Sequence, residues 1–178
     1  SDVYKRQKYG SVSVDATGKW TYDLNNAKAQ AIETGAEEQF EVKVTDSQGG
    51  SDYRQITIRI TGNNDSAVIS GTTSAALTEA NTALSTGGQL TATDVDSSAA
   101  FVAQTGVAGG NGFGTFSIDA SGKWTYTMNT AHDEFKAGTT YTDNLTVKTA
   151  DGTSQIITIS IAGTNDAAVI GGVSVASI

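Results

Sequence analysis

Apolar and polar residues alternate through several short segments of the chain. Residues 55–62 read QITIRITG, with an isoleucine at every second position, and residues 156–163 read IITISIAG. A period of two places these isoleucines on one face of an extended chain, which is typical of a half-buried β-strand. Both segments are therefore predicted to be strands that cover a core with one face.

The strands are predicted to form hairpins. FEVKVTD (residues 40–46) and LTVKTAD (145–151) also alternate, and each is followed by a glycine-containing turn and then by an isoleucine strand. SVSVDATGKWTYDL (11–24) has the same character, with ATG as its turn. This pattern indicates β-hairpins and favours Trp20 and Trp124 as core anchors. NAKAQAIETG and HDEFKAG are predicted to form at most a single helical turn.

The chain repeats itself. YGSVSVDATGKWTYDLNN (9–26) returns as FGTFSIDASGKWTYTMNT (113–130), 104 residues later. QITIRITGNNDSAVISG (55–71) returns as IITISIAGTNDAAVIGG (156–172), 101 residues later, so we expect the length difference to lie in a hairpin loop. A period near 100 residues is about one immunoglobulin-sized sandwich, so each repeat is expected to be a domain.

The repeat predicts the organisation of the chain. Counting from the second Asn-Asp pair, residues 67–166 make one complete repeat, 1–66 the C-terminal part of a truncated repeat, and 167–178 the first strand of a following repeat. The predicted fold class is all-β, with immunoglobulin-like β-sandwich repeats in tandem.

Composition excludes several functions. The net charge is −8, a sign that opposes nucleic acid and anionic membranes as partners. No apolar run is long enough for membrane insertion. Cysteine is absent, which excludes disulfides, thiolate zinc sites and a cysteine nucleophile. An excess of carboxylates also suits plain solubility, which remains an alternative to any metal site.

Acidic residues gather at predicted strand ends in the complete repeat. Short Asp and Asn side chains on strand ends can supply the oxygen ligands that calcium needs, although each of them is also an ordinary turn residue. The candidates are Glu79 in ALTEAN, Asp94 and Asp96 in TATDVDSS, Asp151 in TADGTS, and Asn165 with Asp166 in GTND.

Several blocks in this order resemble a known family. TEAN, LTATDVD, the GTFSIDASGKWTY block, VKTADG and ITISIAGTNDAAV resemble the VCBS repeats of large bacterial RTX-type surface adhesins and, more distantly, cadherin repeats. The likeness covers residues 67–170 almost completely, whereas residues 9–66 match the later blocks only. It implies cadherin-like sandwiches, an extracellular or bacterial cell-surface location, and a role in cell adhesion or biofilm.

The resemblance also implies a calcium-stabilised junction between neighbouring repeats of the same chain. Any cell-surface or matrix ligand would be bound through other domains of the protein. The linkers lack the acidic residue and the proline that such a junction usually has, so we expect one calcium ion per junction. Carried over by position, one end of the complete repeat would hold Asp94, Asp96 and Asp151 facing Asn64 and Asp65, and the opposite pole would hold Glu79 near Asn165 and Asp166.

Two other functions were weighed from the sequence. A carbohydrate- or protein-ligand-binding module could use Trp20, Trp124, Tyr22 or Tyr126 as stacking surfaces, but these residues fall inside the strand pattern. An enzyme is disfavoured, because the single histidine, His132, lies in a polar HDEF stretch without a counterpart in the first copy and is expected to be solvated. The sequence thus predicts a non-catalytic structural module.

Overall fold

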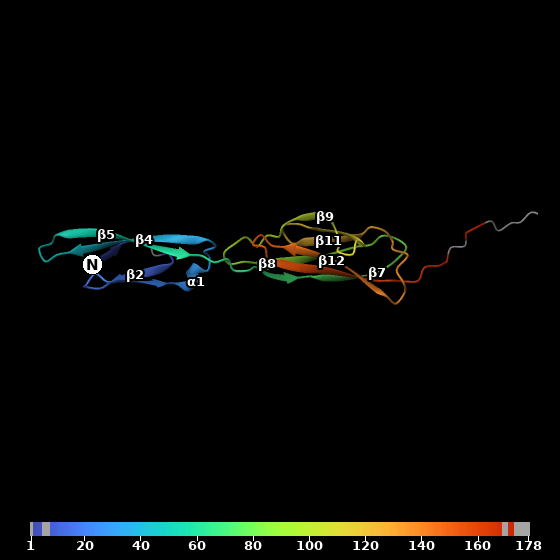
Figure 1. Ribbon diagram of the computed structural model, residues 1–178, viewed down its shortest axis with the longest axis horizontal. Coiled ribbons are helices and arrows are strands. Elements are labelled where there is room, and N and C mark those ends of the chain that lie inside the picture. The colour runs from blue at the N-terminus through green and yellow to red at the C-terminus, as the bar shows by residue number, and fades with distance from the viewer. Residues whose placement is uncertain (1, 5–7, 169–170, 173–178) are drawn as a thin grey trace, which may run out of the picture. The chain divides into compact units, whose positions relative to one another are not determined.

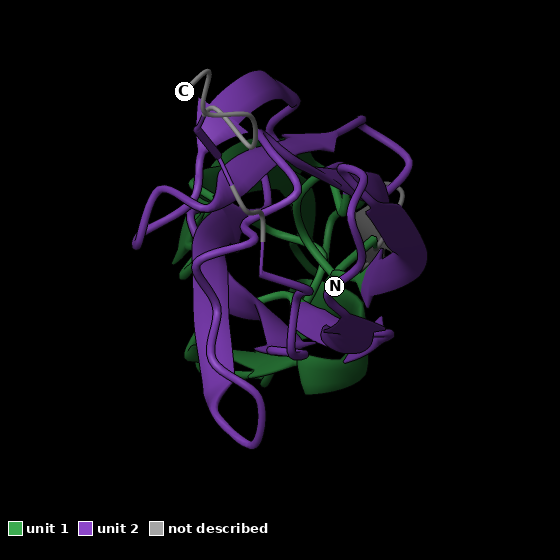
Figure 2. Cartoon of the chain, turned by 90° about the vertical axis from the view of Figure 1, so that its right-hand side faces the viewer, with its two compact units in different colours: residues 1–67, 93–99 green, residues 68–92, 100–178 purple. Residues whose placement is uncertain are grey.

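The fold is all-β and forms two compact units. The computed structural model describes residues 2–4, 8–168 and 171–172 (Figure 1). Unit 1 comprises residues 1–67 and 93–99, and unit 2 comprises residues 68–92 and 100–178 (Figure 2). The helix in the described part of the chain is the four-residue α1 (Asn26–Ala29), capped by the Asn25 side chain, which accepts from Lys28 N–H at 3.2 Å. The expectation of a single helical turn is confirmed there.

Unit 2 is a sandwich of two sheets. One sheet has the strand order β6-β8-β11-β10-β9 and the other the order β12-β13-β7. The pairs β8–β11, β11–β10, β10–β9 and β12–β13 are antiparallel, whereas β13 and β7 are parallel. The strands are β6 (Val68–Gly71), β7 (Ser74–Thr78), β8 (Ser85–Thr93), β9 (Gln104–Ala108), β10 (Gly114–Ile118), β11 (Lys123–Met128), β12 (Thr140–Lys148) and β13 (Ser154–Ala162).

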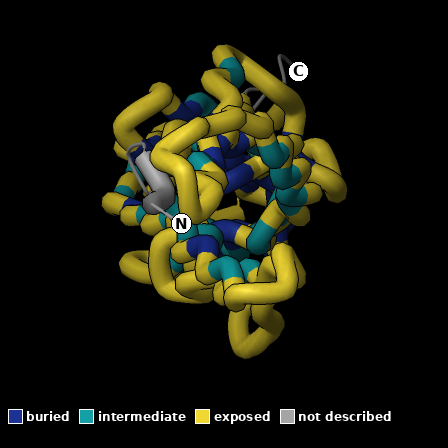
Figure 3. Tube along the Cα trace, turned by 90° about the vertical axis from the view of Figure 1, so that its left-hand side faces the viewer, coloured by how far each residue is buried: buried dark blue, intermediate teal, exposed yellow. Residues whose placement is uncertain are grey.

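The core of unit 2 follows the period-two pattern of its strands. In β11 every second residue is buried, and β12 and β13 alternate in the same way. Both sheets contribute to one apolar cluster, as expected for two sheets that face each other. Figure 3 colours the trace of the chain by burial, and its outer loops are mostly exposed. Trp124 is only 1% exposed, and its indole N–H donates to the carbonyl of Thr72 at 2.8 Å.

Unit 1 contains fewer strands. A three-stranded sheet has the order β1-β4-β5, and β2 with β3 forms a separate hairpin. Its strands are β1 (Asp2–Tyr4), β2 (Gly10–Val14), β3 (Trp20–Leu24), β4 (Gly35–Thr45) and β5 (Ser51–Thr61). By the sequence repeat, β2 and β3 correspond to β10 and β11, and β4 and β5 correspond to β12 and β13. The predicted hairpins are all present.

Trp20 does not behave like its counterpart Trp124. Its side chain is 47% exposed, so the prediction of a core anchor is confirmed for Trp124 and wrong for Trp20. In unit 2, β8 lies beside β11, and Gly88 of β8 faces the Trp124 ring so closely that a Cβ there would lie 2.7 Å from a ring carbon. Among the described residues of unit 1, β3 pairs only with β2, which leaves the Trp20 ring without this cover.

The two long hairpins differ in their strands and not in their turns. The turn of the first is closed by Asp46 N–H donating to Gly50 C=O at 2.9 Å, and that of the second by Thr149 N–H donating to Thr153 C=O at 2.9 Å. β4 and β5 have 11 residues each, whereas β12 and β13 have 9 each. The expected loop insertion is therefore wrong, because the additional residues extend both paired strands.

Each unit buries a carboxylate that accepts a hydrogen bond from a tyrosine of the β2–β3 or β10–β11 hairpin. In unit 2, Asp143 is fully buried and accepts from the Tyr126 hydroxyl at 3.2 Å and from the N–H groups of Asn111, Phe113 and Gly114 at 2.9 to 3.1 Å. In unit 1 the equivalent residue, Glu38, accepts from the Tyr22 hydroxyl at 2.5 Å. It also accepts from the Lys8 and Tyr9 N–H groups at 2.6 and 2.8 Å.

These two carboxylates have a structural role. A buried charge is tolerated when its oxygens are hydrogen-bonded, and here backbone N–H groups of the preceding loop supply most of the bonds. Burial first and the neighbouring carboxylate second raise the pKa of both Tyr22 and Tyr126, so these hydroxyls stay protonated as donors. The carboxylates fix the loop that leads into β2 and the loop that leads into β10.

Candidate metal centre

Three carboxylates converge at one end of unit 2. Glu79, Asp133 and Asp166 each offer an oxygen, and these oxygens lie within 4.8 Å of one another. In the part of the chain that the structure describes, this is the one group of three acidic or metal-ligating side chains that meets so closely. The strongest candidate for a cation site therefore joins residues from three separate segments.

Glu79 is placed by the strand that precedes it. Its backbone N–H donates to Ala162 C=O at 2.8 Å, which extends the parallel pairing of β7 with β13 by one residue. The side chain is only 2% exposed, and its Oε2 accepts from the Thr164 hydroxyl and from Thr164 N–H at 3.2 Å. One oxygen of Glu79 thus holds the segment that follows β13, where Asp166 lies.

Two oxygens of this group are buried without a partner. Glu79 Oε1 and Asp166 Oδ2 have no hydrogen-bond donor among the described residues. Leaving such atoms unpaired is costly, and the cost increases for charged groups. Burial first, and then the nearby charges of Glu79 and Asp133, raise the pKa of Asp166. A bound cation would supply the missing partner to both oxygens and neutralise the repulsion.

The donor set fits a hard cation. All three side chains offer carboxylate oxygen, the ligand type of calcium and magnesium, and no sulfur or nitrogen donor belongs to the group. Calcium accepts irregular oxygen geometries and completes its shell with backbone carbonyls and water, whereas magnesium requires a near-octahedral site. The group therefore suits calcium better.

Asp133 was missed by the sequence analysis. It follows His132, which has a φ of 61°, an uncommon conformation for a residue with a side chain. The histidine ring is 7% exposed, stacks on Phe135 at 4.6 Å, and bonds through Nδ1 to Glu134 Oε1 at 2.7 Å and through Nε2 to Phe113 O at 2.8 Å. The expectation of a solvated His132 is wrong, because aromatic rings enclose it and both nitrogens are bonded.

The histidine fixes the loop that carries Asp133. Burial lowers the pKa of His132, but its bonds to Glu134 and to the Phe113 carbonyl outweigh burial and raise the pKa overall. The paired acidic residues in HDEF were the signal that could have pointed to this loop. HDEF lies far from ALTEAN and GTND in the sequence, so the sequence did not indicate that Asp133 is close to Glu79 and Asp166 in the fold.

A second acidic group lies in unit 1. Asp65 N–H donates to Asp96 Oδ2 at 3.1 Å, and the N–H groups of Asp96 and Ser97 donate to Asp94 Oδ1 at 3.0 and 2.9 Å. These backbone bonds lower the pKa of Asp94, whereas burial and then the neighbouring charges of Asp94 and Asp65 raise the pKa of Asp96. Asp96 Oδ1 is also buried without a partner among the described residues. The predicted neighbours Asp65, Asp94 and Asp96 are thus brought together.

The other predicted ligands are placed differently. Asp151 belongs to unit 2, and its carboxylate accepts from the hydroxyls of Thr149 and Thr153 and from Thr153 N–H at 3.1 Å within its own turn. Asn64 and Asn165 are exposed, and each donates its side-chain amide to the carbonyl of the following aspartate, at 3.0 and 3.1 Å. These three residues do not join the carboxylate group of Glu79.

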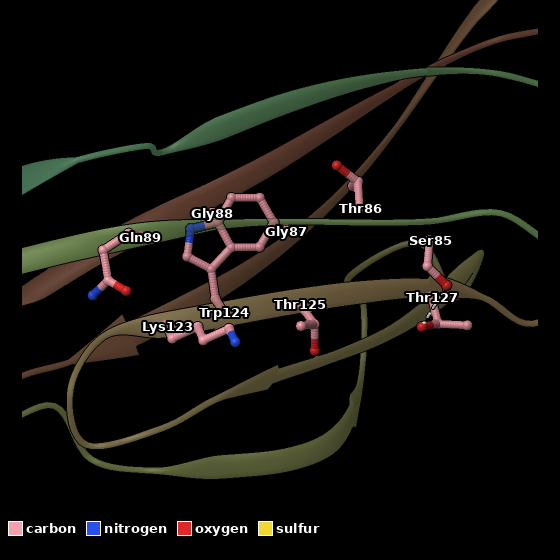
Figure 4. Close-up of a pocket in the computed structure, with 9 residues that line it drawn as sticks. All are labelled: Ser85, Thr86, Gly87, Gly88, Gln89, Lys123, Trp124, Thr125 and Thr127. Carbon is pink, nitrogen blue, oxygen red and sulfur yellow. Dashed lines mark hydrogen bonds between the residues drawn. The ribbon is translucent and has the colours of Figure 1, made fainter.

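A shallow groove of about 710 Å³ lies over β8 and β11 (Figure 4). Trp124 projects to the side of β11 opposite Lys123 and Thr125, and its ring is buried (Figure 4). Tyr126 is fully buried as well. Neither residue can stack on a sugar in this fold, so this part of the ligand-binding alternative is wrong.

Fold and site define a β-sandwich repeat protein with an oxygen-only acidic centre at one end of a sandwich. A family model described as a bacterial cadherin-like domain matches residues 64–163, more than half of the 178-residue chain. The chain belongs to this family. A second model, described as a bacterial Ig domain, matches residues 1–59.

Several solved structures of cadherins resemble the chain at low sequence identity. The protocadherin gamma B4 extracellular domain has a TM-score of 0.43 and 14% identity, over 93% of this chain and 27% of that chain. Protocadherin gamma B2 extracellular cadherin domains 1-5 have a TM-score of 0.41 and 16% identity, over 93% of this chain and 33% of that chain. Mouse clustered PcdhgC3 EC1-3 has a TM-score of 0.41 and 13% identity, over 92% of this chain and 55% of that chain. The chain thus spans between 27% and 55% of the length of these proteins.

Comparison with curated proteins gives no match. No helix in the described part of the chain is long and apolar enough to cross a membrane.

Proposed function

We propose that this chain is a non-catalytic structural module of a bacterial surface adhesin, with repeats stabilised by calcium. The observation that carries the proposal is the convergence of Glu79, Asp133 and Asp166, two of whose oxygens are buried without a partner in the part of the chain that the structure describes. Membership of the bacterial cadherin-like family supports it, because such domains are typical of extracellular or surface proteins. The VCBS repeat remains the proposed repeat type.

The proposed organisation follows the sequence repeat. Residues 1–66 form the later part of one repeat, residues 67–166 a complete repeat, and residues 167–178 the start of the next. Glu79 and Asp166 then lie where one repeat passes into its successor, and calcium bound there limits the freedom of the linker. The proposed partners are neighbouring repeats, and any cell-surface or matrix ligand binds elsewhere in the protein.

The second acidic group is proposed as a weaker cation site. Asp65, Asp94 and Asp96 lie close together, but the first two donate or accept bonds that already order the local backbone. Asn64, Asn165 and Asp151 are proposed to contribute only through their backbone carbonyls or through outer-sphere contacts, because each side chain is hydrogen-bonded locally. We therefore propose that unit 2 holds the tighter calcium ion.

Calorimetric titration with calcium tests the proposal directly. The chain should bind calcium with a Kd of roughly 0.1–1 mM, the range of extracellular modules, and magnesium more weakly. Asp133→Asn should abolish the tighter event, and the exposed Asp52→Asn serves as a control that keeps it. If calcium binding to the wild type and to Asp133→Asn released or absorbed the same heat, this site would be refuted.

A further inference from the structure

One loop of unit 2 carries an Asn-Gly pair that the proposed function does not use. Residues 109–114 read GGNGFG and lead from β9 into β10, and both Asn111 and Gly112 are exposed. No other asparagine of the chain is followed by glycine. Glycine has no Cβ, so its backbone nitrogen is open to the side chain of the residue before it. The pair is therefore able to react with itself in water.

The reaction available to such a pair is deamidation. The backbone nitrogen of Gly112 attacks Cγ of Asn111, and its proton passes to the side-chain nitrogen, which leaves as ammonia. The new C–N bond closes a succinimide ring. Water then adds to either carbonyl carbon of the ring and opens it to aspartate or isoaspartate. The reaction consumes one water, releases one ammonia and involves no oxidation or reduction.

The fold restrains both reacting groups. Gly112 N–H donates to Gly109 C=O at 3.0 Å, and Asn111 Nδ2 donates to Thr142 C=O at 2.6 Å. Gly112 C=O in turn accepts from Asn129 Nδ2 at 2.8 Å. The nitrogen that must lose its proton is thus hydrogen-bonded, and the amide that must approach it is held to β12. The reaction therefore requires this loop to open locally.

The same loop is anchored to the buried Asp143. Asn111 N–H donates to Asp143 Oδ1 at 2.9 Å, and Phe113 N–H donates to Asp143 Oδ2 at 3.1 Å. An aspartate in place of Asn111 has no side-chain N–H for the Thr142 carbonyl, and it adds a negative charge to a loop that is bonded to a buried carboxylate. Isoaspartate in addition lengthens the backbone of the loop. Both products should therefore hold the loop less tightly than asparagine does.

We propose that Asn111 is a site of spontaneous deamidation whose rate is set by opening of the 109–114 loop. The folded chain reacts only while the loop is open, and the product then keeps the loop from closing fully. In the first copy of the repeat, Gln7 and Lys8 take the positions of Asn111 and Gly112, so the Asn-Gly pair occurs in unit 2 alone. The products do not revert to asparagine, so the modified fraction records how long a chain has spent with this loop open.

Incubation of the 178-residue chain at mildly alkaline pH, followed by peptide mass spectrometry, tests this inference. The peptide that contains Asn111 should gain the mass difference between an amide and a carboxyl group, with isoaspartate among the products. Asn26 and Asn129 are also exposed but precede alanine and threonine, so they should still be unmodified in the same digest. Modification of these two residues as fast as that of Asn111 would overturn the inference.

Two conditions test the control by the loop. Asn129→Ala removes the bond to Gly112 C=O at an exposed residue and should speed deamidation of the folded chain about threefold or more, whereas urea that unfolds the chain should speed it about tenfold or more. Equal rates in the folded wild type, in the variant and in urea would show that the loop exerts no control.

Asn111→Asp reproduces the aspartate product and tests its effect on the fold. It should lower the denaturant midpoint of the chain. Asn26→Asp, which adds the same charge to an exposed residue of unit 1, should not lower it. If Asn111→Asp were as stable as the wild type, the product would not keep the loop open. All these measurements are made in a calcium chelator, so their outcome is independent of the proposed calcium site.

Discussion

Glu79 and Thr164 are hydrogen-bonded across 85 residues of sequence, with Thr164 N–H 3.2 Å from Glu79 Oε2. The bond joins the end of β7 to the segment that follows β13. It also occupies one carboxylate oxygen, and the other, Oε1, is buried beside Asp133 and Asp166 without a hydrogen-bond partner among the described residues. Three carboxylates arranged in this way destabilise the fold without a cation and stabilise it when a cation is bound. Substitution of one of them should therefore have opposite effects in the two conditions.

The effect of Glu79→Gln on the stability of the protein should change sign between a chelator and calcium. In a chelator the variant should be as stable as the wild type or more stable by up to about 1 kcal/mol, because the amide removes one of three like charges. With calcium the variant should be the less stable protein. Denaturant unfolding under both conditions measures this. A variant that is less stable by the same amount in both would show that Glu79 serves packing alone.

Acid should weaken unit 1 through Glu38. Burial raises the pKa of Glu38, but the bonds from the Tyr22 hydroxyl and from the Tyr9 and Lys8 N–H groups outweigh burial and lower it below 4.5. A carboxyl whose pKa is lowered in the folded state adds stability above its unfolded pKa, and this stability is lost as pH falls through the folded value. The free energy of unfolding should therefore decrease as the pH is lowered from about 4.5.

Glu38→Gln is the matched variant for this pH dependence. It should be less stable than the wild type at neutral pH, because an amide accepts fewer bonds, and its stability should change less between pH 6 and pH 3. Denaturant unfolding of both proteins at pH 6 and at pH 3 measures the difference. If the variant and the wild type lose stability in parallel, another carboxylate must be responsible.

The repeated hairpin turn allows a comparison between copies. Gly18 and Gly122 both have a φ of +85°, but a Cβ at Gly122 would lie 2.4 Å from the Leu90 carbonyl oxygen, whereas nothing lies within 4 Å of one at Gly18. Gly18→Ala should cost about 1 kcal/mol from the backbone alone, and Gly122→Ala about 2–4 kcal/mol. Thermal unfolding of both variants measures the difference. Equal losses would mean that the Leu90 contact is relieved at no cost.

Much of the strand arrangement could be predicted from the sequence. The isoleucines of β5 and β13 alternate with polar residues, and the hairpin turns carry glycine at the expected places. These signals are local, so they survive without knowledge of tertiary contacts. The exposure of Trp20 could not be predicted in this way, because burial depends on a covering strand and not on the periodicity of β3 itself.

The candidate site was predicted only in part. Glu79 and Asp166 were expected at the same pole, and the structure places them together; their role as ligands is a proposal. Asp133 lies in a loop whose path depends on packing of the His132 ring among Phe113 and Phe135. No periodicity marks such a loop, so the third carboxylate became visible only with the fold.

The central claim is that calcium binds at Glu79, Asp133 and Asp166, and thermal unfolding tests it most directly. With a Kd of roughly 0.1–1 mM, about 10 mM calcium should stabilise the wild type by about 1.4–2.7 kcal/mol relative to a chelator, a rise of about 5–15 °C in Tm. Asp52→Asn should show the same rise and Asp133→Asn little or none. An equal rise in all three proteins, or none in the wild type, would contradict the claim.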